Sequence, residues 1–186
     1  MTPYFVISYP RSRTVWLAIY LKGLGIPAVH EAYKYAAQGQ PMQEFLRGLS
    51  KDGGPVVNVD CGNTLCLDNI KRDFPDARYI VITRDIEPVM DELKAVFGHW
   101  MEEIREPLRE MFRLGVAQAH AHEHFDIEFD KWTPDVSQGL VDWMGGPWPL
   151  DSVWHYFMHG VNAQLLPERM KQEFRIVSNR QFVETR

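Results

Sequence analysis

Short apolar runs alternate with longer amphipathic segments along most of the chain. Three runs, at residues 4–8, 56–60 and 77–83, are mostly apolar and rich in β-branched or aromatic residues, as strands buried on both faces of a sheet usually are. Residues 27–32 are predicted to form a further short strand. The segment at residues 124–129 alternates between apolar and polar positions, and we predict that it forms the last strand.

The segments between these runs have the spacing of helices. In the first of them, Leu17, Leu21 and Leu24 share one face, and Gly25 is well placed to end the helix. Further helices are predicted at residues 42–49, 64–74, 88–99, 100–122, 135–144 and 150–166. Alternation of strand and helix is typical of a mostly parallel sheet covered on both faces. We therefore predict an α/β protein with three layers, α/β/α.

Length and composition are those of one globular domain. The 186 residues suit a single domain, with a core at residues 4–130 followed by C-terminal helices at residues 135–166. Hydrophobic residues make up 45% and charged residues 24%, which excludes disordered and fibrous classes. No apolar run approaches the ~20 residues of a membrane span. The N-terminal segment is predicted to be the first strand and not a signal peptide.

The net charge and the cysteine content bear on the kind of ligand and on the cellular compartment. The net charge of −5 and a pI of about 5.8 argue against a general nucleic-acid-binding protein. Cys61 and Cys66 are too few for a disulfide scaffold, so a reducing, cytoplasmic setting is expected. Their spacing is not that of a CxxC motif, and we expect neither a redox nor a metal role for them.

The most informative stretch is Ser-Tyr-Pro-Arg-Ser-Arg-Thr-Val-Trp-Leu at residues 8–17, where the first strand passes into the first helix. The first N–H groups of a helix and its positive dipole end favour an anion. Arg11 and Arg13 add two cations, and Ser12 and Thr14 add hydroxyl donors. We predict a phosphate or sulfate site here. The alternative is a solvent-exposed turn with an ordinary Ser or Thr cap.

Residues 4–21 resemble the first strand, phosphate loop and helix of sulfotransferases that use 3′-phosphoadenosine-5′-phosphosulfate (PAPS). The matching positions of their loop motif are Pro10, Arg11, Ser12, Thr14, Trp16 and Leu17. A second stretch at residues 74–93 is similar to the later strand and 3′-phosphate segment of that family, in which Arg-Asp-Pro follows an apolar strand. The resemblance implies a P-loop NTPase-like fold and covers most of residues 4–150.

The resemblance also implies roles for particular residues. It assigns cofactor binding to Arg11, Ser12, Arg13, Thr14, Val15, Trp16 and Arg84. Arg11 would stabilise charge on the leaving phosphate, backbone N–H groups of residues 12–15 would hold the 5′-phosphate, Trp16 would stack on adenine, and Arg84 would bind the 3′-phosphate. The implied reaction transfers a sulfuryl group from PAPS to a hydroxyl or amine of a small-molecule acceptor. The helices after residue 100 would shape the acceptor pocket.

A general base for this transfer is less clearly marked. Asp60 follows the strand at residues 56–60, where it faces the expected site, and it is our candidate catalytic base beside Arg11. An equally weighted interpretation makes Asp60 a structural partner that holds Arg11 or Arg84.

Departures from the motif support a second hypothesis, a non-sulfating P-loop-type protein that binds a nucleotide or phosphorylated ligand and is degenerate or kinase-like. Arg13 replaces a loop glycine, Val15 replaces a hydroxyl residue, and Glu92 stands where a serine is usual. The last glycine is Gly160, so the family's C-terminal Gly-rich loop is absent or different. Because no GxxxxGK[ST] motif is present, ordinary ATP or GTP hydrolysis is disfavoured. A purely structural or interaction module is the third hypothesis.

Histidines are the remaining candidates for metal chemistry. His120, His122 and His124 alternate and would share one face of a strand, and His155 and His159 would share one face of a helix. Either set could act with Asp126 or Glu128, but no metal-binding motif is present. We therefore predict no metal site.

Overall fold

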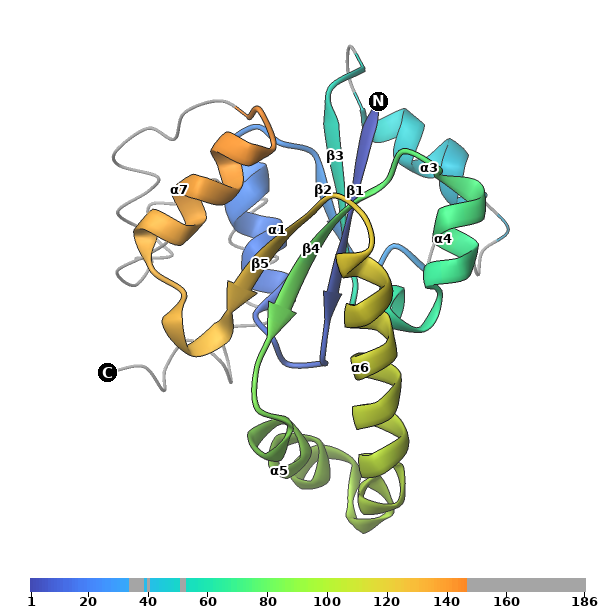
Figure 1. The fold of residues 1–186 in the computed structure, drawn as a ribbon, viewed down its shortest axis with the longest axis vertical. Helices are drawn as coiled ribbons and strands as arrows, with labels where there is room; N and C mark the ends of the chain where they lie inside the picture. Colours follow the sequence, from blue (N-terminus) through green and yellow to red (C-terminus); the bar gives the residue numbers. More distant parts are fainter. Residues whose placement is uncertain (34–38, 40, 51–52, 147–186) are drawn as a thin grey trace.

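The structure is a computed structural model that describes residues 1–33, 39, 41–50 and 53–146. Its centre is a five-stranded, all-parallel sheet with strand order β2-β3-β1-β4-β5 (Figure 1). The strands are β1 (Thr2–Ser8), β2 (Ala28–His30), β3 (Pro55–Val59), β4 (Arg78–Thr83) and β5 (His124–Glu128). These five strands confirm the predicted ones to within a few residues at each end.

Strand β1 lies at the middle of the sheet, where Phe5 is paired with Asn58 of β3 on one side and Tyr79 of β4 on the other. Its residues from Tyr4 to Ser8 are all buried, because helices cover both faces of the sheet. A strand enclosed in this way needs apolar side chains on both faces, and this explains its unbroken apolar sequence.

Helices follow the strands in the expected order. They are α1 (Thr14–Gly23), α3 (Met42–Leu49), α4 (Leu67–Asp73), α5 (Ile86–Phe97), α6 (Arg105–His120) and α7 (Pro134–Trp143), with 3-10 helices η2 (Cys61–Leu65), η3 (His99–Ile104) and η4 (Phe129–Lys131). Two predicted helices are each divided: residues 64–74 form the end of η2 and then α4, and residues 100–122 form η3 and then α6. Pro107 lies in the first turn of α6, where its missing N–H needs no acceptor. The predicted helix at residues 150–166 lies outside the described residues.

Successive side chains of β1 point to opposite faces of the sheet, and each face has its own core and its own layer of helices. Tyr4 and Val6 point into a core formed with α1 and α7, whereas Phe5 and Ile7 point into a second core formed with α3, α4 and α6. The two sets of helices lie on opposite sides of the sheet (Figure 1). This confirms the predicted α/β fold with three layers.

Helices α5 and η3 extend past the ends of the strand arrows (Figure 1). They share a smaller apolar cluster with Tyr9 and with Phe112 of α6, whose rings stack with centroids 3.8 Å apart. This cluster adjoins the loop after β1. Among the described residues, no helix is long and apolar enough to cross a membrane.

Candidate anion-binding site

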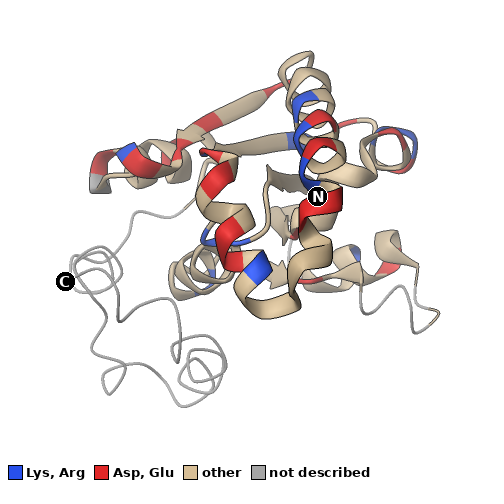
Figure 2. Ribbon diagram, turned by 90° about the horizontal axis from the view of Figure 1, so that it is seen from below, with Lys and Arg blue, Asp and Glu red and all other residues tan. Residues whose placement is uncertain are grey.

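The candidate site is the loop of residues 9–13, which joins the carboxyl end of β1 to the start of α1. Ligands of open parallel sheets bind at the carboxyl ends of the strands. Because β1 is central, the ends of β3 and β4 flank this loop on either side. Seen from this end of the sheet, acidic and basic segments are interspersed over the described helices (Figure 2).

The loop backbone is unusual at two arginines. Arg11 has φ 65° and Arg13 has φ 57°, both in the left-handed region, whereas Ser12 between them does not. Side-chain-bearing residues seldom adopt this conformation, which costs of order 1–3 kcal/mol where it is imposed. Alternation of this kind turns successive N–H groups toward a common concavity, as in anion-binding nests. The position at which the sulfotransferase motif has glycine therefore has a glycine-like backbone, although Arg13 occupies it.

Ser12 is the loop residue between the two arginines with left-handed backbone. It is fully buried, and its Oγ has no hydrogen-bond partner in the described part of the chain. An unsatisfied buried hydroxyl costs roughly 1–3 kcal/mol, and such groups in native proteins need an explanation. A bound oxyanion that accepts from Oγ would supply one.

Arg84 is a neighbour of Arg11 and Arg13, the two arginines of the loop. Arg84, which follows β4, lies with its Cζ 4.1 Å from the ring centroid of Phe129, and Arg13 lies 4.5 Å from the same centroid. Arg84 also donates through Nη1 to the backbone carbonyl of Arg11, at 2.6 Å. The structure thus brings the second motif, at Arg84, next to the loop of the first motif.

Glu92 of α5 is the acidic partner of this cluster. Its Oε2 accepts from Nε of Arg11 at 2.8 Å, and its Oε1 lies 3.9 Å from Nη2 of Arg84. Glu92 therefore holds Arg11 in place. Its carboxylate also pairs with a guanidinium group that an incoming anion would otherwise contact. The sequence identified Glu92 as a departure from the motif but did not reveal this pairing.

Burial disfavours the charged forms of Arg13 and Arg84. Burial lowers the pKa of Arg13, and the neighbouring Arg84 cation lowers it further, while Asp130 opposes both effects. Burial also lowers the pKa of Arg84, with Glu92 and Asp130 opposing it. Because the nearby carboxylates do not offset the loss of hydration, an added anion would stabilise both cations.

The first residues of α1 differ in what they contact. Thr14 Oγ1 lies 3.3 Å from Nε2 of His30, at the end of β2. Val15 packs partly against the core. Trp16 is only 6% exposed, and its ring is parallel to that of Tyr20, with centroids 5.0 Å apart. The indole of Trp16 thus packs within the core, and its stacking on adenine stays a prediction.

Asp60 follows β3 and caps η2. It is 8% exposed, and its Oδ1 accepts from the backbone N–H of Gly62 at 2.8 Å. Burial and then the Asp60 charge raise the pKa of the adjacent Cys61 thiol to about 11. The ion pairs of Arg11 and Arg84 that the structure shows are with Glu92 and not with Asp60. The role of Asp60 as a base stays a prediction.

Two polar residues of η2, Asn63 and Thr64, support the loop, and the sequence analysis did not identify them. Thr64 Oγ1 accepts from the N–H of Ser8 and donates to its carbonyl, each at 3.1 Å. Asn63 Nδ2 donates to the carbonyls of Val6 and Asn58, each at 3.0 Å. These side chains fix the carboxyl end of β1 immediately before the loop. Their only sequence signal was a polar pair that begins three residues after the predicted strand at residues 56–60.

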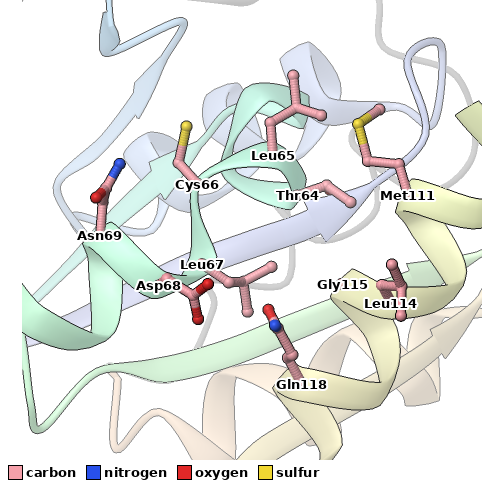
Figure 3. Close-up of a pocket in the computed structure, with 10 residues that line it drawn as sticks. All are labelled: Thr64, Leu65, Cys66, Leu67, Asp68, Asn69, Met111, Leu114, Gly115 and Gln118. Carbon is pink, nitrogen blue, oxygen red and sulfur yellow. The ribbon is translucent and has the colours of Figure 1, made fainter.

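Two adjoining hollows lie beside the loop, between η2 and α6. The smaller, of about 90 Å³, is lined in part by Ser8, Tyr9 and Pro10. The larger, of about 370 Å³, shares Thr64, Leu65 and Met111 with it and is shown in Figure 3. Gly115 permits the close approach of α6 here, since a Cβ at this position would lie 2.8 Å from Cγ2 of Thr64.

The larger hollow is lined by apolar and polar side chains of three elements, η2, α4 and α6. Leu67 and Leu114 contribute apolar surface, and Asp68, Asn69 and Gln118 contribute polar groups (Figure 3). The hollow is large enough for a small organic molecule. Helix α6 forms one wall of this hollow, and the shaping of an acceptor pocket by helices after residue 100 stays a prediction.

Comparisons with known proteins identify the fold. No protein-family model and no curated protein matches the sequence. Among solved structures, the chain is similar to the YorR protein of Bacillus subtilis in complex with phosphorylated GDP, with a TM-score of 0.54 and 13% identity over 76% of this chain and 94% of that one. A gluconokinase of Sinorhizobium meliloti 1021 aligns with a TM-score of 0.41 and 12% identity, over 77% of this chain and 90% of that one.

The similarity to the YorR protein shows a shared fold, which is the P-loop NTPase-like α/β architecture that the sequence predicted. At 13% identity the likeness extends to the fold alone.

Proposed function

We propose that the protein binds a phosphorylated nucleotide through the loop of residues 9–13 and the start of α1. The observation that carries this proposal is the gathering of Arg11, Arg13 and Arg84 around a loop with two left-handed residues. A phosphate would accept from the first N–H groups of α1 and from Ser12 Oγ, and it would stabilise the charges of Arg13 and Arg84, which burial disfavours. The YorR protein, which has this fold, is in complex with phosphorylated GDP, and this supports a nucleotide as the ligand.

The hollows beside the loop suggest a transferase that moves a group from the nucleotide to a second molecule. They begin at Ser8, Tyr9 and Pro10 and continue between η2 and α6. An acceptor bound there would lie next to the phosphate held by the loop. Such an enzyme works chiefly by positioning its substrates and stabilising charge, which fixed arginines and backbone N–H groups can do. Kinase-like phosphoryl transfer is the chemistry that this arrangement supports best.

Sulfuryl transfer from PAPS is the second candidate, and the contact between Arg84 and Arg11 favours it. It brings the predicted 3′-phosphate residue next to the predicted 5′-phosphate loop, as one cofactor with two phosphate groups requires. An acceptor hydroxyl or amine would attack sulfur in line, forming the new bond to sulfur as the bridging oxygen–sulfur bond breaks. Adenosine 3′,5′-bisphosphate would leave with charge stabilised by Arg11, and the acceptor proton would pass to Asp60.

A calorimetric panel separates the two candidates. The wild-type chain is titrated with GDP, GTP, ATP, PAPS and adenosine 3′,5′-bisphosphate. Tighter binding of a nucleoside di- or triphosphate supports the kinase-like protein, and tighter binding of PAPS or the bisphosphate supports the sulfotransferase. Arg13→Ala should weaken the preferred ligand at least tenfold, whereas Arg113→Ala, which removes an exposed arginine of α6 paired with Glu110, should not. Well-folded protein that binds none of the five at millimolar concentration overturns both candidates.

A further inference from the structure

We propose that His120, His124 and Asp126 form a binding site for a divalent transition metal ion, with Zn²⁺ as the best match. The three residues lie around the turn that joins the end of α6 to the start of β5. Because the strands are parallel, the start of β5 is at the opposite edge of the sheet from the loop of residues 9–13. This proposal is therefore independent of the proposed function.

The ligand atoms are already gathered. One atom from each of the three side chains lies within 4.8 Å of the other two. His120 Nε2 is 2.8 Å from Asp126 Oδ1, and His124 Nε2 is 3.6 Å from Asp126 Oδ2. Tetrahedral Zn²⁺ with bonds of ~2.0–2.1 Å needs neighbouring ligand atoms roughly 3.4 Å apart. Small side-chain rotations would therefore bring all three atoms onto one ion.

A hydrogen bond behind the cluster orients one ligand for metal binding. His124 Nδ1 lies 2.8 Å from the backbone carbonyl of His122. Since a carbonyl can only accept, Nδ1 carries the hydrogen, and Nε2 of the neutral ring then presents its lone pair toward Asp126. Metal-bound histidines almost always donate their second ring nitrogen in this way. This bond is an observation independent of the clustering itself.

The chemistry of the group selects the kind of metal. Two imidazole nitrogens and one carboxylate oxygen suit Zn²⁺, Co²⁺ or Ni²⁺ better than Mg²⁺ or Ca²⁺, which prefer oxygen ligands throughout. The side chains of His120, His124 and Asp126 are 41%, 29% and 53% exposed, so water can complete the coordination. A metal held there would tie the end of α6 to the edge strand β5.

The structure also explains which of the alternating histidines take part. His120 and His124 stack with ring centroids 4.5 Å apart, beside Asp126. The ring of His122 instead lies near Tyr79, with centroids 5.8 Å apart, and only its backbone carbonyl reaches the cluster. His122→Ala is thus a matched control, since it deletes a neighbouring imidazole and keeps the carbonyl.

The test is a calorimetric titration of the full chain with ZnCl₂ after treatment with EDTA and its removal. Wild type should bind one ion with micromolar affinity or better at this site. His124→Ala and Asp126→Asn should each lower that affinity at least tenfold. His122→Ala and His99→Ala should not, and neither should the double substitution His155→Ala with His159→Ala, which removes the other pair of histidines four residues apart.

Two further measurements keep the result interpretable. Circular dichroism and the melting temperature of the metal-free variants establish that each is folded. The visible spectrum of the Co²⁺-loaded wild type should show strong bands of a four-coordinate ion, and His124→Ala should lose them. Equal Zn²⁺ affinity in wild type and a folded His124→Ala variant, or loss of binding only in the His155 and His159 double variant, overturns the proposal.

Discussion

Arg84 donates a hydrogen bond through Nη1 to the backbone carbonyl of Arg11, at 2.6 Å. The bond joins the segment after β4 to the loop after β1, across 73 positions of the sequence. A guanidinium group has five N–H donors, so Arg84 can hold the loop and still bind an anion. The same side chain, Arg84, can therefore hold the loop backbone in place and bind an anion at the loop.

Replacement of Arg84 should affect both properties. Arg84→Ala leaves the carbonyl of Arg11 without this donor and removes a cation from the site, so it should lower stability by about 1–3 kcal/mol and weaken binding of the preferred nucleotide at least tenfold. Arg84→Lys should recover only part of the binding, because an ammonium group cannot stack on Phe129 and donate along the same directions. Urea unfolding and calorimetry measure the two effects. Full affinity in a folded Arg84→Ala variant would contradict this role.

The left-handed backbone at Arg13 can be tested by comparing Gly with Ala. Both substitutions remove the same cation and the same contact with Phe129, but only glycine adopts φ 57° without strain. Arg13→Gly should therefore be more stable than Arg13→Ala by about 1 kcal/mol, and both should bind the nucleotide more weakly than wild type. Urea unfolding of the pair gives the difference. A more stable alanine variant would show that the loop does not have this conformation in solution.

Ser12 should show opposite effects on stability and binding. Ser12→Ala removes a buried hydroxyl without a protein partner, so stability should stay the same or rise by up to ~1 kcal/mol, while phosphate affinity should fall. Ser8→Ala is the matched control, because its Oγ is likewise buried and without a partner but precedes the loop. It should change stability in the same direction and leave affinity unchanged. Unaltered phosphate affinity in Ser12→Ala would remove this hydroxyl from the site.

Glu92 should act as a competitor of the ligand. Glu92→Gln keeps the shape of the side chain and removes the charge that pairs with Arg11 at 2.8 Å. Because the carboxylate is 39% exposed, the pair is worth no more than ~1 kcal/mol, and affinity for the nucleotide should rise up to about fivefold. Calorimetry at two salt concentrations would measure the gain, which should shrink at high salt. A loss of affinity would mean that Glu92 positions Arg11 for binding.

The thiol of Cys61 should be unreactive at neutral pH. Burial and then Asp60 raise its pKa from 9.0 to about 11, so the folded state favours the protonated form. A thiol that ionises more readily in the unfolded chain stabilises the fold at lower pH, and this contribution is lost as pH rises from about 9 to about 11. Stability should therefore fall less over this range in Cys61→Ala than in wild type. Alkylation of Cys61 followed by mass spectrometry should become rapid only toward pH 11.

The fold and the place of the candidate site could be predicted from the sequence. Apolar runs of strand length, separated by helical segments, determine a covered parallel sheet, because each run needs only its own composition to favour burial. The position of Arg11, Ser12 and Arg13 directly after the first run places them at the carboxyl edge of that sheet. A local pattern was sufficient for both inferences.

Only the tertiary structure decided how the side chains near the loop are used. It paired Glu92 with Arg11, placed the Trp16 indole in the core, made Asp60 a helix cap and joined Thr64 to Ser8. The pairs Arg11–Glu92 and Ser8–Thr64 span 81 and 56 positions. Contacts at such separations depend on strand order and helix packing, which set the distance between side chains that the sequence lists only in order. For the same reason, the three alternating histidines did not lead to a predicted metal site. The turn between α6 and β5 brings two of them to Asp126, and this closeness was not visible in the sequence.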